Sequence, residues 1–195
     1  MAMTFSHDLD PALDRSRRGR VVVLNGTSSS GKSSLAGALQ QRMDQPWFHL
    51  PIDRWHTMRG PVVGDEPFDR VFQRTVLGFL ASVGAMARAG NHVIVDVVLG
   101  ERWRLRELLA AAAGLDLVLV RVFCPLEELV RREHDRGNRT AGIAAMQYPL
   151  VHAGIDHDVT VDTSTASPEA CAEVVAAYLR SLGDGPWPPA AAARA

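Results

Sequence analysis

The stretch Gly26-Thr27-Ser28-Ser29-Ser30-Gly31-Lys32-Ser33 contains the pattern that decides the fold of this chain. It spells G-x-x-x-x-G-K-[ST], a loop whose backbone N–H groups surround a phosphate and whose lysine reaches the β- and γ-phosphate oxygens. Lys32 is the single lysine of the chain, beside twenty arginines. A compact ammonium on a flexible stem fits this space, whereas a planar guanidinium does not. The sequence therefore predicts a nucleotide phosphate site made of these eight residues and Ser34.

The flanks of the loop support this interpretation. Residues 21–24 read Val-Val-Val-Leu, a β-branched run typical of a buried parallel strand, and a helical pattern opens directly after the loop. A strand, a glycine-rich turn and a helix in this order aim the N–H groups of the helix at a phosphate. The alternative is a Gly- and Ser-rich turn that matches the pattern by chance, and the flanks disfavour it.

The rest of the chain alternates between strand and helix patterns, which is typical of α/β proteins with a parallel sheet and right-handed crossovers. We expect a P-loop NTPase/kinase fold, a central five-stranded parallel sheet flanked by helices with a short arginine-bearing lid. It would form one kinase domain over residues 20–182, with flexible tails at 1–19 and 183–195. The expected strands are 20–25, 47–52, 92–97, 116–123 and 157–162, and the expected helices are 32–43, 68–89, 101–113, 125–136, 142–153 and 167–182.

Composition narrows the function classes. The chain has 195 residues, 47% of them hydrophobic, and a formal net charge of −1, which fits one globular domain and argues against nucleic acid or an anionic membrane as the main partner. Without an apolar run of membrane-spanning length or a signal-peptide pattern, we expect a cytoplasmic protein. Cys124 and Cys171 are expected to be buried reduced thiols. A homo-oligomer is compatible with the sequence but is not readable from it.

A phosphate loop predicts nucleotide binding but not a reaction. GTPases recognise guanine with an Asn-Lys-x-Asp loop, and this chain has no second lysine to supply one. Transport and motor ATPases usually need larger chains with further motifs. Small-molecule kinases remain, and they add a carboxylate near the acceptor and a mobile arginine-bearing lid.

Two aspartates follow predicted strands on the edge of the sheet where α/β proteins bind ligands. Asp96 ends the apolar run of residues 92–95, which is the Walker B arrangement, and we expect it to hold Mg²⁺ together with the hydroxyl of Ser33. Asp53 follows residues 47–52 and is suited to accept the proton of an acceptor hydroxyl, or to orient it. From position alone, an N-cap for a helix starting near Arg54 is an equal alternative for Asp53.

Arginines around residues 136–139 suit the lid. Arg136 and Arg139 bracket Gly137-Asn138 between two helical patterns, so we expect their guanidinium groups to stabilise charge on the transferred phosphoryl group. Arg131 and Arg132 are expected instead to form a solvated helix face with Glu127, Glu128 and Glu133. His134 is expected at the surface.

Over residues 20–182 the chain resembles the chloramphenicol phosphotransferase family, small P-loop kinases that phosphorylate the primary hydroxyl of chloramphenicol. The shared segments are residues 24–33, 52–53, 86–90 and 93–100 and, most extensively, the block from Arg136-Gly137-Asn138-Arg139 to Thr163. The resemblance implies that Asp53 is the catalytic aspartate, that the loop binds ATP and that Arg136 and Arg139 are lid arginines. It also implies that the adenine ring lies near Thr163-Ser164-Thr165.

The chain departs from the family at two places. Asp96-Val97 stands where the family has two consecutive acids, and Arg54 to Arg74 is shorter than the family segment that shapes the acceptor pocket. We therefore expect an ATP- and Mg²⁺-dependent O-phosphotransferase acting on a small molecule, with chloramphenicol or a related antibiotic as the first acceptor and resistance as the role. The alternatives are a kinase for another hydroxylated antibiotic, nucleoside or metabolite, and a regulator that binds a nucleotide without turnover. The choice between ATP and GTP stays open.

Overall fold

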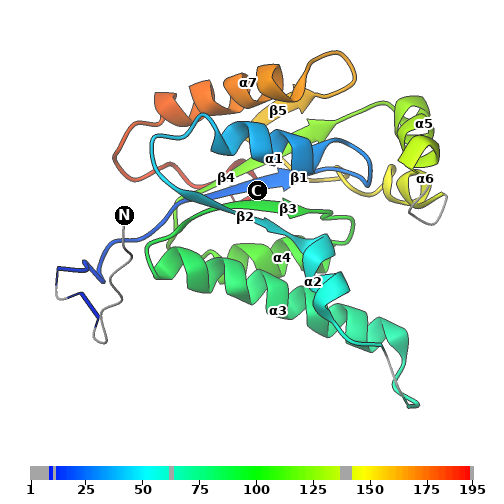
Figure 1. Cartoon of the computed structure of the whole chain (residues 1–195), viewed down its shortest axis with the longest axis horizontal. Helices are drawn as coiled ribbons and strands as arrows, with labels where there is room; N and C mark the ends of the chain where they lie inside the picture. Colours follow the sequence, from blue (N-terminus) through cyan, green and yellow to red (C-terminus); the bar gives the residue numbers. More distant parts are fainter. Residues whose placement is uncertain (1–8, 11, 62–63, 137–141, 194–195) are drawn as a thin grey trace, which may run out of the picture.

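The computed structural model describes residues 9–10, 12–61, 64–136 and 142–193 and contains one five-stranded parallel sheet (Figure 1). The strands are β1 (Val21–Asn25), β2 (Trp47–Pro51), β3 (His92–Val97), β4 (Leu117–Phe123) and β5 (Val159–Asp162). Their order in the sheet is β2-β3-β1-β4-β5, with all neighbours parallel. All five expected strands are present within a residue or two of their predicted bounds, so the predicted α/β P-loop fold is confirmed.

The strand order brings three segments together at the carboxyl edge of the sheet. β3 lies between β1 and β2, with Asp96 opposite Leu24 on one side and opposite Pro51 on the other. The phosphate loop leaves β1 at this edge, and the chain enters α2 (Ile52–Met58) directly after β2. The positions of Lys32, Asp53 and Asp96 therefore follow from the topology of the sheet.

Helices cover both faces of the sheet. One face packs against α3 (Phe68–Arg88) and α4 (Arg102–Ala111), and the other against α1 (Lys32–Gln40) and α7 (Pro168–Ser181), as Figure 1 shows. The valines of β1 alternate between the two resulting cores, and all of them are fully buried. α5 (Leu126–Arg136) and α6 (Ile143–Gln147) lie near the end of the sheet at which the strand arrows point (Figure 1). Among the described residues, no helix has the length and apolar character needed to cross a membrane.

Two helices differ from the expectations. α2 is absent from the predicted helices, because its seven residues are too few to show a helical repeat. α6 ends at Gln147, whereas the pattern predicted a helix over 142–153. Pro149 lacks an N–H group and restricts the residue before it, so it stops this helix early.

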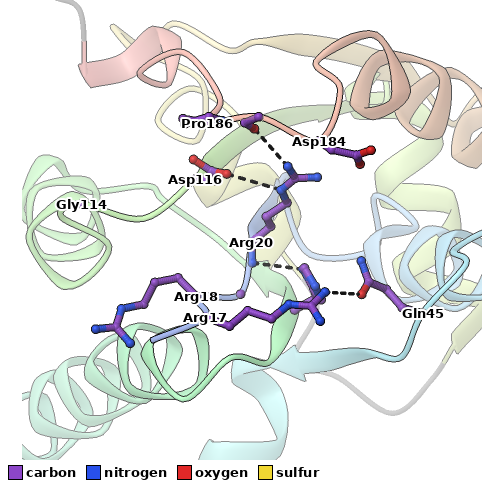
Figure 2. A pocket seen from close by; sticks show the side chains of 11 residues that line it. Arg17, Arg18, Arg20, Gln45, Gly114, Asp116, Asp184 and Pro186 are labelled. Carbon is purple, nitrogen blue, oxygen red and sulfur yellow. Dashed lines mark hydrogen bonds and ion pairs between the residues drawn. The ribbon is translucent and has the colours of Figure 1, made fainter. Parts of the chain in front are cut away.

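The segment after α7 packs on the sheet, in contrast to the flexible end expected from its composition. Trp187 is 8% exposed, its backbone N–H donates to Asp116, and the guanidinium of Arg20 lies 4.7 Å from the centre of its ring. Figure 2 shows the guanidinium of Arg20 between Asp116 and the chain at Pro186, where it donates to the carbonyl oxygen of Gly185 at 3.0 Å. These residues line a pocket of about 600 Å³ at the amino ends of the strands. One buried aromatic ring thus fixes a segment that Gly and Pro content marked as irregular.

Candidate active site

The phosphate loop curls tightly at the carboxyl end of β1. Gly31, the N-cap of α1, and Ser29 both have positive φ values, 83° and 64° respectively. A Cβ at Gly26 would lie only 2.6 Å from the carbonyl oxygen of Val122 on β4, so only glycine fits there. These backbone conformations form a tight loop at the start of a helix, which is the arrangement that binds anions.

The loop has unsatisfied polar atoms that suit a phosphate. The hydroxyl oxygens of Ser29 and Ser30 are buried and lack a hydrogen-bond partner within the described part of the chain. In that same part, no side chain caps the first turn of α1, which begins at Lys32. Buried donors and an uncapped helix start are what a nucleotide phosphate would satisfy, so the residues present fit this group.

Lys32 points back over its own loop. Its side chain is buried, and Nζ donates to the carbonyl oxygen of Thr27 at 2.6 Å and lies 3.8 Å from Oδ1 of Asp96. The ammonium is therefore held between the loop and β3. This is the position expected for a cation that reaches the β- and γ-phosphates.

Asp96 receives contacts from three directions. Ser33 Oγ donates to its Oδ2 at 2.6 Å, Lys32 faces Oδ1, and His49 Nε2 of β2 lies 3.6 Å from Oδ2. Burial alone would raise the pKa of this carboxyl, but the charge of Lys32, the nearby His49 ring and the hydrogen bond from Ser33 outweigh burial and lower the pKa overall. Asp96 is therefore a carboxylate at neutral pH. A hydroxyl beside a buried carboxylate is a ligand pair that Mg²⁺ accepts.

Asp53 lies in the first turn of α2 and is exposed. The capping alternative is wrong, because α2 begins at Ile52, its N-cap is Pro51, and no side chain caps it. Pro51 is opposite Asp96, the predicted metal ligand, in the β2–β3 ladder. Asp53 comes two residues after Pro51. Asp53 is thus an exposed carboxylate at this edge of the sheet.

Aromatic and cationic side chains gather around His56, three residues after Asp53. The rings of His56 and Phe72 stack at 4.7 Å, and the Arg104 guanidinium lies 5.2 Å from the centre of Phe72. Burial, followed by Arg59, lowers the pKa of His56, while Asp53 acts in the opposite direction. His56 is therefore neutral at pH 7. Arg104 was not identified from the sequence, because it belongs to α4 and no local motif marks it.

The nucleotide side of the loop opens into a pocket of about 370 Å³. Its lining includes Gly31, Ser34, Arg136 and Thr163, so the loop after β5 meets the phosphate loop as expected. Arg139 lies outside the described residues, and so do Gly137 and Asn138. The remaining lining residues are Ser29, Arg131, Arg132, Asp135, Ala166 and Pro168.

α5 differs in part from the solvated face expected of it. Arg131 is exposed and pairs with Glu128 and Asp135, and the side chain of His134 is 89% exposed, both as predicted. Arg132, however, reaches inward, and its Nη2 donates to the carbonyl oxygen of Thr163 at 2.7 Å. Glu133 is buried and accepts the N–H groups that open α6. The i, i+4 charge pattern does not distinguish these inward positions from the outer face.

Asn25 is a structural residue of the site that the sequence analysis did not single out. It ends β1 fully buried, where its Oδ1 accepts the N–H of Leu99 and its Nδ2 donates to the carbonyl oxygen of Val151 at 2.8 Å. The same Nδ2 lies 3.1 Å from His157 Nε2. One amide thus joins the ends of β1, β3 and the segment before β5. An amide that ends a valine-rich buried strand is the signal that identifies such a residue.

The fold and the site together define a P-loop kinase, in which the phosphate loop, Asp96 and Asp53 lie at one edge of the sheet. More narrowly, the chain belongs to the chloramphenicol phosphotransferase-like family, whose model matches residues 19–180. The chain is therefore an O-phosphotransferase of the small-molecule kinase type.

Curated relatives agree with this assignment. The chain is 28% identical over 183 residues to the "Putative O-phosphotransferase Rv2636" of Mycobacterium tuberculosis H37Rv, an alignment that covers 77% of each protein. A second M. tuberculosis protein, from strain CDC 1551 / Oshkosh and also named as an O-phosphotransferase, matches to the same extent.

Solved structures show the same fold. The M. tuberculosis APS kinase in complex with AMPPNP and APS superposes with a TM-score of 0.66 at 21% identity, covering 84% of this chain and 99% of that one. The tunicamycin resistance protein of Deinococcus radiodurans has a TM-score of 0.63 at 20% identity, with coverages of 88% and 100%. A gluconokinase of Sinorhizobium meliloti 1021 has a TM-score of 0.60 at 21% identity, with coverages of 85% and 94%.

Proposed function

We propose that this chain transfers the γ-phosphate of ATP, in the presence of Mg²⁺, to a hydroxyl group of a small molecule, with chloramphenicol or a related antibiotic as the first acceptor and resistance as its role. The observation that carries the proposal is the register of β2 and β3. Because Pro51 is opposite Asp96, the chain reaches Asp53 two residues beyond the strand position that faces the Ser33–Asp96 pair, which supports a role for Asp53 at this edge of the sheet. The family match favours the phenicol class of acceptor.

Each site residue has a distinct role in this proposal. The loop amides and Lys32 hold the β- and γ-phosphates, and Ser33 and Asp96 would hold Mg²⁺, which neutralises charge on the phosphate oxygens. Asp53 accepts the proton of the acceptor hydroxyl or orients that hydroxyl. Arg136, on the pocket wall, stabilises the charge that develops on the transferred group. Arg139 is proposed for the same role on the family resemblance alone.

The donor set suits Mg²⁺. Among the described residues, His, Cys, Asp and Glu nowhere gather in threes, as a closed metal cage would require. Mg²⁺ in phosphotransferases uses one or two protein ligands and completes its shell with phosphate oxygens and water. The Ser33–Asp96 pair supplies what such a site needs.

A panel of acceptors tests the proposal. ATP consumption is measured with chloramphenicol, with a chloramphenicol analogue that lacks the primary hydroxyl, and with other hydroxylated antibiotics, nucleosides and sugars. We expect consumption that depends on the acceptor and stops when the accepting hydroxyl is removed. Tight ATP binding without transfer to any acceptor would favour the non-catalytic regulator instead.

Asp53→Asn tests the chemical role, and Asp69→Asn is its matched control. Both aspartates lie in the first turn of a helix and both are exposed, so their effects on helix stability are comparable. We expect Asp53→Asn to lower turnover by about 10²- to 10⁴-fold with nearly unchanged ATP affinity. Asp69→Asn should keep wild-type turnover. Full turnover by Asp53→Asn would refute the proton-acceptor role.

One observation favours a second acceptor class. In the divergent segment after Asp53, His56 stacks on Phe72, and Arg104 of α4 lies 5.2 Å from the centre of the Phe72 ring. Such a surface suits a planar or anionic hydroxylated metabolite as well as a phenicol. Equal turnover of such a metabolite in the panel would support this alternative.

A further inference from the structure

Gln147, the last residue of α6, contacts the phosphate loop directly. The backbone N–H of Ser28 donates to Gln147 Oε1 at 2.7 Å, across 119 positions of sequence. The side chain of Gln147 is half-buried, and Ser28 is only 3% exposed. A buried amide needs an acceptor, and the carboxamide of Gln147 provides it.

The Ser28 amide belongs to the end of the loop where the transferred phosphate is expected. Ser28 follows Thr27, whose carbonyl oxygen accepts a hydrogen bond from Lys32 Nζ at 2.6 Å. The lysine of a phosphate loop reaches the β- and γ-phosphates, whereas the start of the following helix faces the inner phosphates. Gln147 therefore contacts the loop amide that is nearest to the γ-phosphate position.

α6 is held at both ends, so the backbone at Gln147 has little freedom to move. Glu133 accepts the N–H groups of Gly142 and Ala144 at 2.8 Å and 3.1 Å. Beyond the helix, the carbonyl oxygen of Val151 accepts from the buried amide of Asn25 at 2.8 Å. These anchors fix the backbone, and only the side chain of Gln147 is left to move when an anion enters the loop.

We propose that the carboxamide of Gln147 occupies the position of the γ-phosphate on the loop. A nucleoside triphosphate displaces this carboxamide, whereas a diphosphate leaves it in place. The proposal rests on the proposed function, because it assumes that the loop binds a nucleotide. A phosphate oxygen is a charged acceptor and forms a stronger hydrogen bond than a neutral carboxamide, so the exchange is favourable. The hydrogen bond lost from Gln147 reduces the gain in binding free energy. Gln147 thereby sets how strongly the site prefers triphosphate over diphosphate.

Isothermal titration with Mg²⁺-AMPPNP and with Mg²⁺-ADP tests this without any acceptor. Gln147→Ala removes the competitor, so we expect AMPPNP to bind about three- to tenfold more tightly and ADP to bind within twofold of wild type. Gln147→Glu keeps the shape, holds the amide with a charged group and repels the γ-phosphate. It should bind AMPPNP at least tenfold more weakly, with a smaller effect on ADP.

Met146→Ala is the matched control, because Met146 precedes Gln147 on the same helix and is 71% exposed. It should leave both affinities unchanged. Equal effects of the Gln147 variants on AMPPNP and ADP, or weaker AMPPNP binding by Gln147→Ala, would overturn this role of Gln147. A wild-type protein that binds neither nucleotide would instead overturn the proposed function, whereas binding without the predicted discrimination overturns only the inference about Gln147.

Discussion

The hydroxyl of Ser33 donates a hydrogen bond of 2.6 Å to Oδ2 of Asp96, although the two residues are 63 positions apart. The preceding residue, Lys32, faces the other oxygen of the same carboxylate at 3.8 Å. This arrangement exists because β1 and β3 are neighbours in register, with Leu24 opposite Asp96. Lys32 and Ser33 thus contact the two oxygens of the Asp96 carboxylate. These contacts connect the phosphate loop to the proposed metal site.

Asp96→Asn should uncouple nucleotide binding from Mg²⁺. The amide keeps the size of the side chain but removes the charge that would bind the cation, so AMPPNP affinity in Mg²⁺ should fall at least tenfold. Titrations with Mg²⁺ and with EDTA measure the difference. Asp184→Asn, an exposed acid at the opposite edge of the sheet, should behave as wild type. A Mg²⁺ dependence that survives in Asp96→Asn would contradict the metal role.

Gly26→Ala and Gly37→Ala should change stability in opposite directions. A Cβ at Gly26 meets the carbonyl oxygen of Val122 at 2.6 Å, which forces the backbone apart, so we expect a loss of about 1–3 kcal/mol and weaker nucleotide binding. Gly37 lies inside α1 with open space around its Cβ position, and alanine there should add about 0.5–1 kcal/mol. Urea unfolding curves measure both, and a neutral Gly26→Ala would show that the loop is not tightly packed against β4.

The fold was predictable because its signals are local. The phosphate loop, the valine-rich β1 and the aspartate that ends the apolar core of β3 are contiguous stretches whose meaning does not depend on distant residues. The predicted bounds of β3 match the structure. The alternation of strand and helix patterns along the chain indicates a parallel sheet. The loop, Asp53 and Asp96 were therefore located correctly at one sheet edge before any contact was known.

The contacts that complete the site were not predictable in this way. These contacts join segments up to 132 positions apart, and no local pattern encodes them. They are Gln147 with Ser28, Arg132 with Thr163, and the side-chain amide of Asn25 with its three partners. Arg132 illustrates the limit, since it also satisfies the helix-surface pairing with Glu128 that predicted an outward position. Trp187 shows the same limit at the C-terminal segment, where composition alone did not reveal its buried ring.

Two neighbouring histidines, of which His157 contacts Asn25, should make the stability of the protein sensitive to acid. The rings of His152 and His157 lie 5.3 Å apart, and the pKa of each is lowered to about 4. Burial is the main cause for both, followed by His157 for His152 and by Arg121 for His157. His157 Nε2 faces the N–H donor Nδ2 of Asn25, so this contact requires the neutral ring.

The expected pH dependence follows from these lowered pKa values. Between pH 6.5 and about 4 the unfolded chain binds protons on both histidines while the folded chain does not, so the free energy of unfolding should fall with decreasing pH across this window and level off below it. His157→Gln can still accept from Asn25 and removes one titrating group. We therefore expect its loss of stability between pH 7 and pH 5 to be smaller than that of wild type by about 1 kcal/mol, measured by urea unfolding. His134→Gln, whose wild-type side chain is 89% exposed, should keep the wild-type slope. If the slopes of His157→Gln and wild type coincide, the ring beside Asn25 is not neutral in the folded protein.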